Sequence, residues 1–169
     1  MRAIVAVCQD WGIGYRGGLL VQNPADMRSF VQHTKGATVI MGRATLESFP
    51  EQKPLPKRRN IVLSRQTNLE IEGVEQAHSV EELMELVQES SPDELWVIGG
   101  QTVYEQLLPY CNEVVVTKHD CIRPADTYFP NLDKQEDWEI SSAVEGGVTD
   151  EGIAFSFVTY RRVGEGAEV

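Results

Sequence analysis

The chain has 169 residues, of which 41% are hydrophobic and 24% are charged, so it is long enough to form one domain with its own core. Its formal net charge of −11 repels phosphate backbones and anionic membranes, and neither nucleic acid nor a membrane is therefore an expected partner. No apolar run approaches the roughly 20 residues that a membrane-spanning helix needs.

The first part of the chain predicts a strand, a long loop and a helix. Residues 3–7 are an apolar run that is typical of a buried strand and too short for a signal peptide. Residues 9–22 are rich in glycine, and a loop of this length in a compact domain is often a lid. Asn23 is a good N-cap and Pro24 suits the first helical position, so a helix begins here, and Gly36 ends it.

Apolar runs and segments of helical period alternate along the rest of the chain. Ser79 and Glu82 form a capping box, which opens a helix that runs to about Ser90. The alternation predicts an α/β fold with a mostly parallel sheet that helices cover on both faces, and an antiparallel pair near the end of the chain. The other expected strands are 38–41, 60–63, 95–98, 114–117, 138–144 and 154–162, with a helix over 102–108; residues 1–163 would form the domain and 164–169 a flexible tail.

Cysteine and histidine are sparse and scattered. The three cysteines, Cys8, Cys111 and Cys121, include no CxxC pair, which argues against a disulfide framework and against structural zinc. Reduced thiols in a cytoplasm fit this count better, each buried as a small apolar side chain. We expect no metal site.

Asp26 lies in the first turn of the helix that Asn23 opens, and Phe30 follows on the same face four residues later. Two interpretations stand side by side. An acid in a first turn stabilises a helix simply by complementing its dipole. A carboxylate in an apolar cleft beside an aromatic ring would instead have a raised pKa, and it could bind a nitrogen heterocycle through paired hydrogen bonds.

Two predicted strands end in glycine where a helix would begin. Gly42 precedes Arg43, whose guanidinium can bind an anion in bidentate fashion beside the free N–H groups of a helix start. Gly99 and Gly100 follow another buried strand and let a ligand approach the backbone closely. An ordinary surface arginine and a tight turn are the alternatives.

Three consecutive cations, Lys57-Arg58-Arg59, stand out in this acidic chain. A solvated basic loop is the ordinary interpretation. The alternative is that one arginine binds a carboxylate while Leu55 packs against the apolar part of the same ligand.

Taken together, these segments resemble dihydrofolate reductases, in an ordered match along nearly the whole chain. The family's fold is a mainly parallel sheet of about eight strands with an antiparallel edge, in agreement with the elements above. The matching segments are Ile13-Gly14, Pro24-Ala25-Asp26, 39–43, Thr45, Pro54-Leu55-Pro56, 58–64, 97–100, Tyr104, Leu108-Pro109, Val116-Thr117 and 126–130.

The resemblance implies that the substrate is dihydrofolate. Asp26 would bind N3 and the 2-amino group of the pterin, and Thr117 would hydrogen-bond this carboxylate from a neighbouring strand. Arg58 would bind the α-carboxylate of the substrate's glutamate. The residues that would bound the substrate's rings are Val5, Met27, Phe30, Phe49, Leu55, Ile98 and Tyr104.

The resemblance also implies NADPH as the cofactor. The backbone of Ala6 and Ile13 would hold the nicotinamide carboxamide, and Gly99 and Gly100, joined by a cis peptide, would approach the pyrophosphate. Arginines near the adenosine phosphates would favour NADPH over NADH and would give an acidic chain local sites for anions. The other cofactor residues implied are Gly14, Gly42, Arg43, Ala44, Thr45, Leu63, Ser64, Arg65, Gln101, Thr102 and Val103.

The implied reaction is hydride transfer from nicotinamide C4 to pterin C6, with protonation at N5. Asp26 would favour that protonation by polarising the pterin, with solvent as the proton source. The protein would be a cytoplasmic monomer that binds antifolate inhibitors. Two departures concern the ligands: Leu20-Val21 stands where many members have Pro-Trp, which affects inhibitor affinity more than activity, and Gln101-Thr102 stands where some members carry a cation.

Two other functions share some of these features. A pyrimidine reductase of riboflavin synthesis would use the same fold, the Gly-Gly turn and NADPH, but it has no need of Asp26 with Phe30. A non-catalytic NADPH-binding module would not need Asp26, Thr117 and Arg58 together. Turnover of dihydrofolate discriminates among the three.

Overall fold

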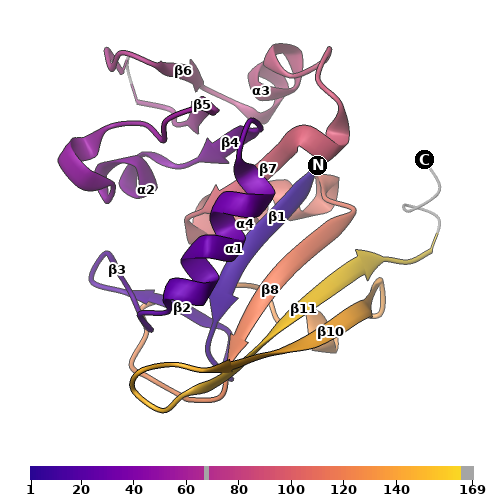
Figure 1. Cartoon of the computed structure of the whole chain (residues 1–169). Helices are drawn as coiled ribbons and strands as arrows, with labels where there is room; N and C mark the ends of the chain where they lie inside the picture. The colour runs from indigo at the N-terminus through magenta and orange to yellow at the C-terminus, as the bar shows by residue number, and fades with distance from the viewer. Residues whose placement is uncertain (67–68, 165–169) are drawn as a thin grey trace.

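An eight-stranded sheet is the centre of the computed structural model, which describes residues 1–66 and 69–164 (Figure 1). The strand order is β10-β11-β8-β1-β7-β4-β5-β6. Strands from β8 to β6 pair in parallel, and β11 pairs antiparallel with β8 and β10, as the sequence predicts. The strands are β1 (Arg2–Val7), β4 (Thr38–Met41), β5 (Arg59–Leu63), β6 (Val74–Ala77), β7 (Leu95–Gly99), β8 (Glu113–His119), β10 (Trp138–Val148) and β11 (Ala154–Arg162).

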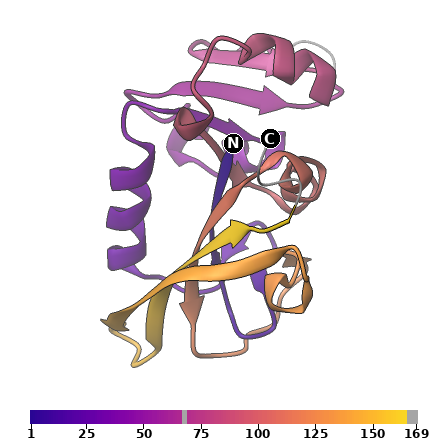
Figure 2. The same ribbon diagram turned by 90° about the vertical axis from the view of Figure 1, so that its right-hand side faces the viewer.

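Helices cover both faces of the sheet, which is why its central strands are almost wholly apolar. On one face, Phe30 and Leu46 from the first two helices pack on a cluster that includes the fully buried Trp96. On the other face, Leu83 and Leu107 from the last two helices pack on a second cluster. Figure 2 shows α1 running along one side of the sheet. The helices are α1 (Pro24–Thr34), α2 (Arg43–Glu47), α3 (Val80–Leu86) and α4 (Gln101–Leu107).

The helix starts follow the predicted caps. Asn23 accepts a hydrogen bond from the backbone N of Ala25 at 3.1 Å, and Ser79 accepts one from that of Glu82 at 3.1 Å. The predicted end of the third helix at about Ser90 is wrong, because α3 stops at Leu86. The backbone then forms turns, in which the N of Gln88 and the N of Ser90 donate hydrogen bonds to carbonyl oxygens three residues earlier. The fourth helix is displaced by one residue at each end, and a 3-10 turn, Leu108–Tyr110, follows it.

The Gly-rich segment 9–22 is not the continuous loop that the sequence predicts. It contains a hairpin of β2 (Gly12–Tyr15) and β3 (Gly18–Leu19), which joins β9 (Thr127–Tyr128) in a small antiparallel sheet of order β3-β2-β9. Arg16 and Gly17 both have positive φ, 49° and 79°, as the two-residue turn of a tight hairpin requires.

Other differences lie at strand boundaries and edges. The edge strand β6 was not predicted, because its run of four residues contains Glu75 and Gln76. β10 extends beyond its expected end to Val148, and β8 extends to His119. The expected tail falls almost wholly outside the described residues, of which Gly164 is the last.

Candidate active site

The carboxyl ends of the central parallel strands meet at one edge of the sheet, where ligand sites of open α/β sheets lie, and Thr117, Gly42 and Gly99 are found there. Thr117 near the end of β8 donates a hydrogen bond from Oγ1 to Oδ1 of Asp26 at 2.6 Å. Asp26 reaches this position from the first turn of α1. Burial raises the pKa of Asp26, an effect that the hydrogen bond from Thr117 and the nearby His119 partly offset. The expected contact between Asp26 and Thr117 is therefore present.

A buried histidine lies near this pair, and no sequence pattern marks it. His119, the last residue of β8, is 3% exposed. Its Nε2 lies 3.1 Å from Nδ2 of Asn23, and its Nδ1 lies 3.3 Å from the carbonyl oxygen of Val7. Burial lowers the pKa of His119. The N-cap of the helix that carries Asp26 is thus tied to the ends of two strands.

An apolar wall continues from Phe30, which lies one helical turn after Asp26 on α1. The partly buried side chains of Phe30, Phe49, Leu55 and Ile98 pack on the same core cluster. Val5 does not join them, because successive side chains of a strand point to opposite faces and Val5 packs in the other cluster. The neighbouring Ile4 belongs to the wall's cluster instead. The alternation along β1 was the signal that could have identified it.

Tyr104 supports the wall from the opposite face of the sheet. Its hydroxyl donates to the carbonyl oxygen of Ile4 at 2.7 Å, and its ring packs edge-on against Phe129 with centroids 4.8 Å apart. The side chain is buried, which raises the pKa of the phenol. Met27, the other expected wall residue, is half exposed at 51% in the first turn of α1.

Arg58 is held in place beside the wall. Its Nε donates to Oγ1 of Thr34 at 3.0 Å, its Nη1 donates to the carbonyl oxygen of Pro56 at 2.8 Å, and its guanidinium lies 5.9 Å from the centroid of Phe30. The side chain of Asn60 fixes the loop that precedes it, with hydrogen bonds to the backbone of Leu55 and Arg58. The cation is therefore oriented by the fold rather than free in solvent.

The two glycine corners lie side by side. The backbone N of Gly42 donates to the carbonyl oxygen of Gly99 at 2.9 Å, and the Gly99-Gly100 peptide is cis. A Cβ on Gly99 would come within 3.1 Å of Oγ1 of Thr45, and one on Gly42 within 3.1 Å of Cγ2 of Val103. Neither α2 nor α4 has a side-chain cap at its N-terminus. The corner therefore offers backbone N–H groups, and a side chain at Gly42 or Gly99 would crowd Val103 or Thr45.

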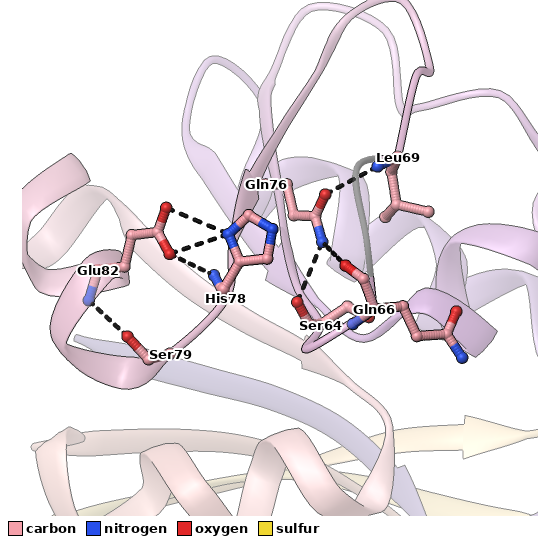
Figure 3. A network of polar contacts seen from close by, with 7 residues as sticks. All are labelled: Ser64, Gln66, Leu69, Gln76, His78, Ser79 and Glu82. Atoms are coloured by element: carbon pink, nitrogen blue, oxygen red, sulfur yellow. Dashed lines mark hydrogen bonds and ion pairs between the residues drawn. The ribbon is translucent and has the colours of Figure 1, made fainter.

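A loop after β5 carries Ser64 and Arg65, and Gln76 of β6 holds it (Figure 3). The Nε2 of Gln76 donates to the carbonyl oxygens of Ser64 at 3.0 Å and Gln66 at 2.7 Å, and its Oε1 accepts from the backbone N of Leu69 at 2.8 Å. Arg43 approaches this loop, since it donates to the side chain of Gln66 and pairs with Glu47. Sequence reasoning missed Gln76, because a polar residue on an unrecognised edge strand gives no signal.

A small cavity joins Asp26 to the Gly-rich segment. Ala6, Ile13, Val21 and His119 line it together with Asp26, and it has about the volume of a single water. Gly14 belongs to the adjoining sheet, where a Cβ would come within 2.8 Å of Oγ1 of Thr127. The structure thus brings the expected nicotinamide residues close to the carboxylate.

The remaining expected cofactor residues differ in their exposure and contacts. Ala44, Arg65 and Thr102 are exposed, and Leu63 is buried in the core. The side-chain Oε1 of Gln101 accepts a hydrogen bond from the backbone N of Tyr128 at 2.8 Å.

A larger hollow of about 580 Å³ lies away from this edge, beside Arg2 and Arg162. Its cations are already paired, Arg2 with Glu113 at 3.2 Å and Arg162 with Asp137 at 2.6 Å. Within the described ranges, no group of three or more His, Cys, Asp or Glu could hold a metal ion, and no helix is long and apolar enough to cross a membrane.

The chain is similar to known proteins along nearly its whole length. A family model described as dihydrofolate reductase matches residues 1–162. The chain is 37% identical over 134 residues to the dihydrofolate reductase of Staphylococcus aureus (strain MRSA252), covering 79% of each chain. It is 35% identical over 158 residues to that of Neisseria gonorrhoeae, covering 93% of this chain and 95% of that protein. A solved structure of the dihydrofolate reductase from Enterococcus faecalis, complexed with NADP(H) and RAB-propyl, matches with a TM-score of 0.86 at 33% identity, covering 96% of each chain.

Proposed function

The chain belongs to the dihydrofolate reductase family and reduces 7,8-dihydrofolate to 5,6,7,8-tetrahydrofolate with NADPH, and we propose that the residues around Asp26 carry out this reaction. The observation that carries the proposal is the half-buried carboxylate of Asp26, which accepts a hydrogen bond from Thr117 beside an apolar wall. Such a group is suited to bind the paired donors on one edge of a pterin.

NADPH supplies the hydride, which passes from nicotinamide C4 to pterin C6. Asp26 binds N3 and the 2-amino group of the substrate and so polarises the ring toward protonation at N5, with solvent as the proton source. Thr117 orients the carboxylate. An apolar wall holds the rings of the substrate in the geometry that hydride transfer needs. Its residues are Phe30, Phe49, Leu55, Ile98, Tyr104 and, in smaller part, Met27.

Arg58 binds the α-carboxylate of the substrate's glutamate. Its two hydrogen bonds to Thr34 and Pro56 hold the guanidinium in a defined orientation. A fixed cation loses less conformational entropy on binding than a free one, which favours bidentate recognition of a carboxylate.

The glycine corner suits a dinucleotide. The close approach of Gly42 and Gly99 would bring the pyrophosphate against the backbone, with Gly100, Gln101, Thr102 and Val103 at the start of α4 and Ala44 and Thr45 at the start of α2. Arg43, Ser64 and Arg65 bind the adenosine phosphates, beside Leu63. Ala6, Ile13 and Gly14 hold the carboxamide, and the cavity that Ala6 and Ile13 share with Asp26 supports this assignment.

The chain acts as a cytoplasmic monomer with residues 1–163 as its functional domain, and it binds antifolates in the pocket of its substrate. Three cysteines without a disulfide agree with a reducing compartment.

The test is oxidation of NADPH by the purified protein with dihydrofolate as the substrate, followed by absorbance. Steady turnover supports the proposal, and loss of turnover in the Asp26→Asn variant assigns it to this site. Folded protein that oxidised NADPH with the aminopyrimidine substrate of riboflavin synthesis, and not with dihydrofolate, would overturn it.

A further inference from the structure

Two cysteines distant in the sequence meet at the edge of the candidate site. The Sγ atoms of Cys8 and Cys121 lie 3.6 Å apart although the residues are 113 positions apart. Cys8 directly follows β1, Cys121 lies two residues beyond β8, and these two strands are parallel neighbours. The contact is therefore a consequence of the strand order of the sheet.

Backbone hydrogen bonds hold both cysteines in this position. The backbone N of Gln9 donates to the carbonyl oxygen of Cys121 at 2.9 Å, and that of Cys121 donates to the carbonyl oxygen of His119 at 2.9 Å. The backbone N of Cys8 donates to the carbonyl oxygen of Gly12 at 3.0 Å. A disulfide has an S–S distance of about 2.05 Å, so rotation of the side chains must bring the sulfurs about 1.5 Å closer.

We propose that Cys8 and Cys121 are a modification site, a dithiol that hydrogen peroxide closes to an intramolecular disulfide and that thereby restrains the small β3-β2-β9 sheet over the active site.

The two thiols differ in access, which sets the order of the chemistry. Cys8 is buried at 2% exposure, whereas Cys121 is partly exposed. Burial, together with the contact to Cys121, raises the pKa of the Cys8 thiol to about 12, so Cys8 is a poor first nucleophile. Cys121 is therefore the thiol that peroxide meets first.

The reaction balances with peroxide as the oxidant. The sulfur of Cys121 attacks one peroxide oxygen, the O–O bond breaks, and a sulfenic acid and one water result. The sulfur of Cys8 then forms the S–S bond as the S–O bond of Cys121 breaks, and the leaving hydroxide takes the Cys8 proton as a second water. Two electrons pass from the two sulfurs to the peroxide.

The disulfide would restrain both ends of the Gly-rich segment 9–22. Cys8 borders the cavity that Asp26 and Val21 also line. Arg123, two residues after Cys121, donates to the carbonyl oxygen of Leu20 at 2.5 Å. A disulfide would therefore link Cys8, just before this segment, to the residues around Cys121 and Arg123 that bind its far end. Turnover should fall several-fold, because the motion of such segments often limits the release of product.

The experiment treats the purified full chain with hydrogen peroxide, then maps disulfides by mass spectrometry of non-reduced peptides and measures turnover before and after dithiothreitol. We expect a Cys8–Cys121 cross-linked peptide, one remaining free thiol at Cys111, slower turnover, and recovery of both properties on reduction. Recovery matters because dithiothreitol does not reverse methionine oxidation.

Matched variants separate the pair from the third cysteine. Cys121→Ser and Cys8→Ala should each lose the cross-link and the reversible loss of turnover, whereas Cys111→Ala should keep both. Oxidation of Cys121 to a sulfinic acid with the Cys8 thiol intact would overturn the site. Unchanged turnover in fully cross-linked protein would overturn the restraint on the small sheet.

Discussion

The side-chain amide of Asn23 donates from Nδ2 to Nε2 of His119, 3.1 Å away, while its Oδ1 caps the helix that carries Asp26. This contact fixes the tautomer of the imidazole: Nε2 is the acceptor, so Nδ1 carries the proton and donates it to the carbonyl oxygen of Val7. A protonated His119 would present a second N–H to the amide group of Asn23. The cap of α1 therefore depends on neutral His119.

We expect His119 to make stability depend on pH below neutrality. Burial lowers its pKa from an ordinary value of 6.5, with Asp26 favouring and Arg123 opposing the charged form. The unfolded chain then binds this proton first, so the stability is complete above pH 6.5 and is lost as the pH falls through the lowered pKa of the folded state. The urea midpoint of unfolding should decrease more between pH 7.5 and pH 5 for the native chain than for His119→Gln. Equal pH dependence in the two proteins would contradict this role.

Replacing Asp26 with Asn should lower turnover by about 100-fold or more at neutral pH, because the amide cannot supply the charge that polarises the pterin. NADPH affinity should stay nearly unchanged, since the proposed function assigns Asp26 to the substrate and not to the cofactor. Steady-state rates and a direct NADPH binding titration check the two parts. Activity equal to that of the native chain would show that another carboxylate is involved.

The same variant should be more stable at neutral pH. Burial raises the pKa of Asp26 above its ordinary value of 3.8, so the stability that this carboxyl contributes is present below pH 3.8 and is lost as the pH rises through the raised pKa. Asn does not titrate and can still accept the hydrogen bond from Thr117. The unfolding midpoint of Asp26→Asn should exceed that of the native chain at pH 7, and the gap should close near pH 3. A variant less stable at pH 7 would show that hydrogen bonds stabilise the ionised carboxylate by more than burial destabilises it.

Local patterns in the sequence predicted the elements that carry Asp26 and the glycine corner. Thr117 followed only from the family resemblance, whereas an N-cap before Pro24 and glycines at the ends of buried strands pointed to Asp26 and the Gly99-Gly100 corner. These signals are visible because each lies within a few residues of the element that it begins or ends.

The unpredicted features depend on contacts between distant segments. Gly12–Tyr15 pairs with Gly18–Leu19 and with Thr127–Tyr128, the latter across 113 and 116 positions of chain, and no apolar alternation marks these pieces. His119 acts through Asn23, 96 positions away. Val5 packs on the face of the sheet opposite to Phe30 and Ile98, whereas Ile4 packs with them. A resemblance locates a segment more reliably than it decides which face of a strand a side chain occupies.

Arg43→Ala and Arg65→Ala should each weaken NADPH binding much more than NADH binding, because only NADPH carries the 2′-phosphate that a guanidinium can bind. The dissociation constants of both cofactors for each variant check this. Arg161→Ala is a matched control, since Arg161 is exposed on β11 beside Glu139. Equal weakening of NADPH and NADH would remove both arginines from the 2′-phosphate site.

Gln76→Leu should raise the KM for NADPH about tenfold and leave kcat within about twofold. The substitution keeps the size of the side chain but removes the hydrogen bonds that hold the backbone of Ser64 and Gln66. Each such bond contributes about 1 kcal/mol, and about 1.4 kcal/mol corresponds to a tenfold change in affinity. Gln88→Leu, an exposed glutamine just beyond α3, is the control and should leave both constants unchanged. A fall in kcat with an unchanged KM would mean that Gln76 supports the reacting rings rather than the loop of the cofactor phosphates.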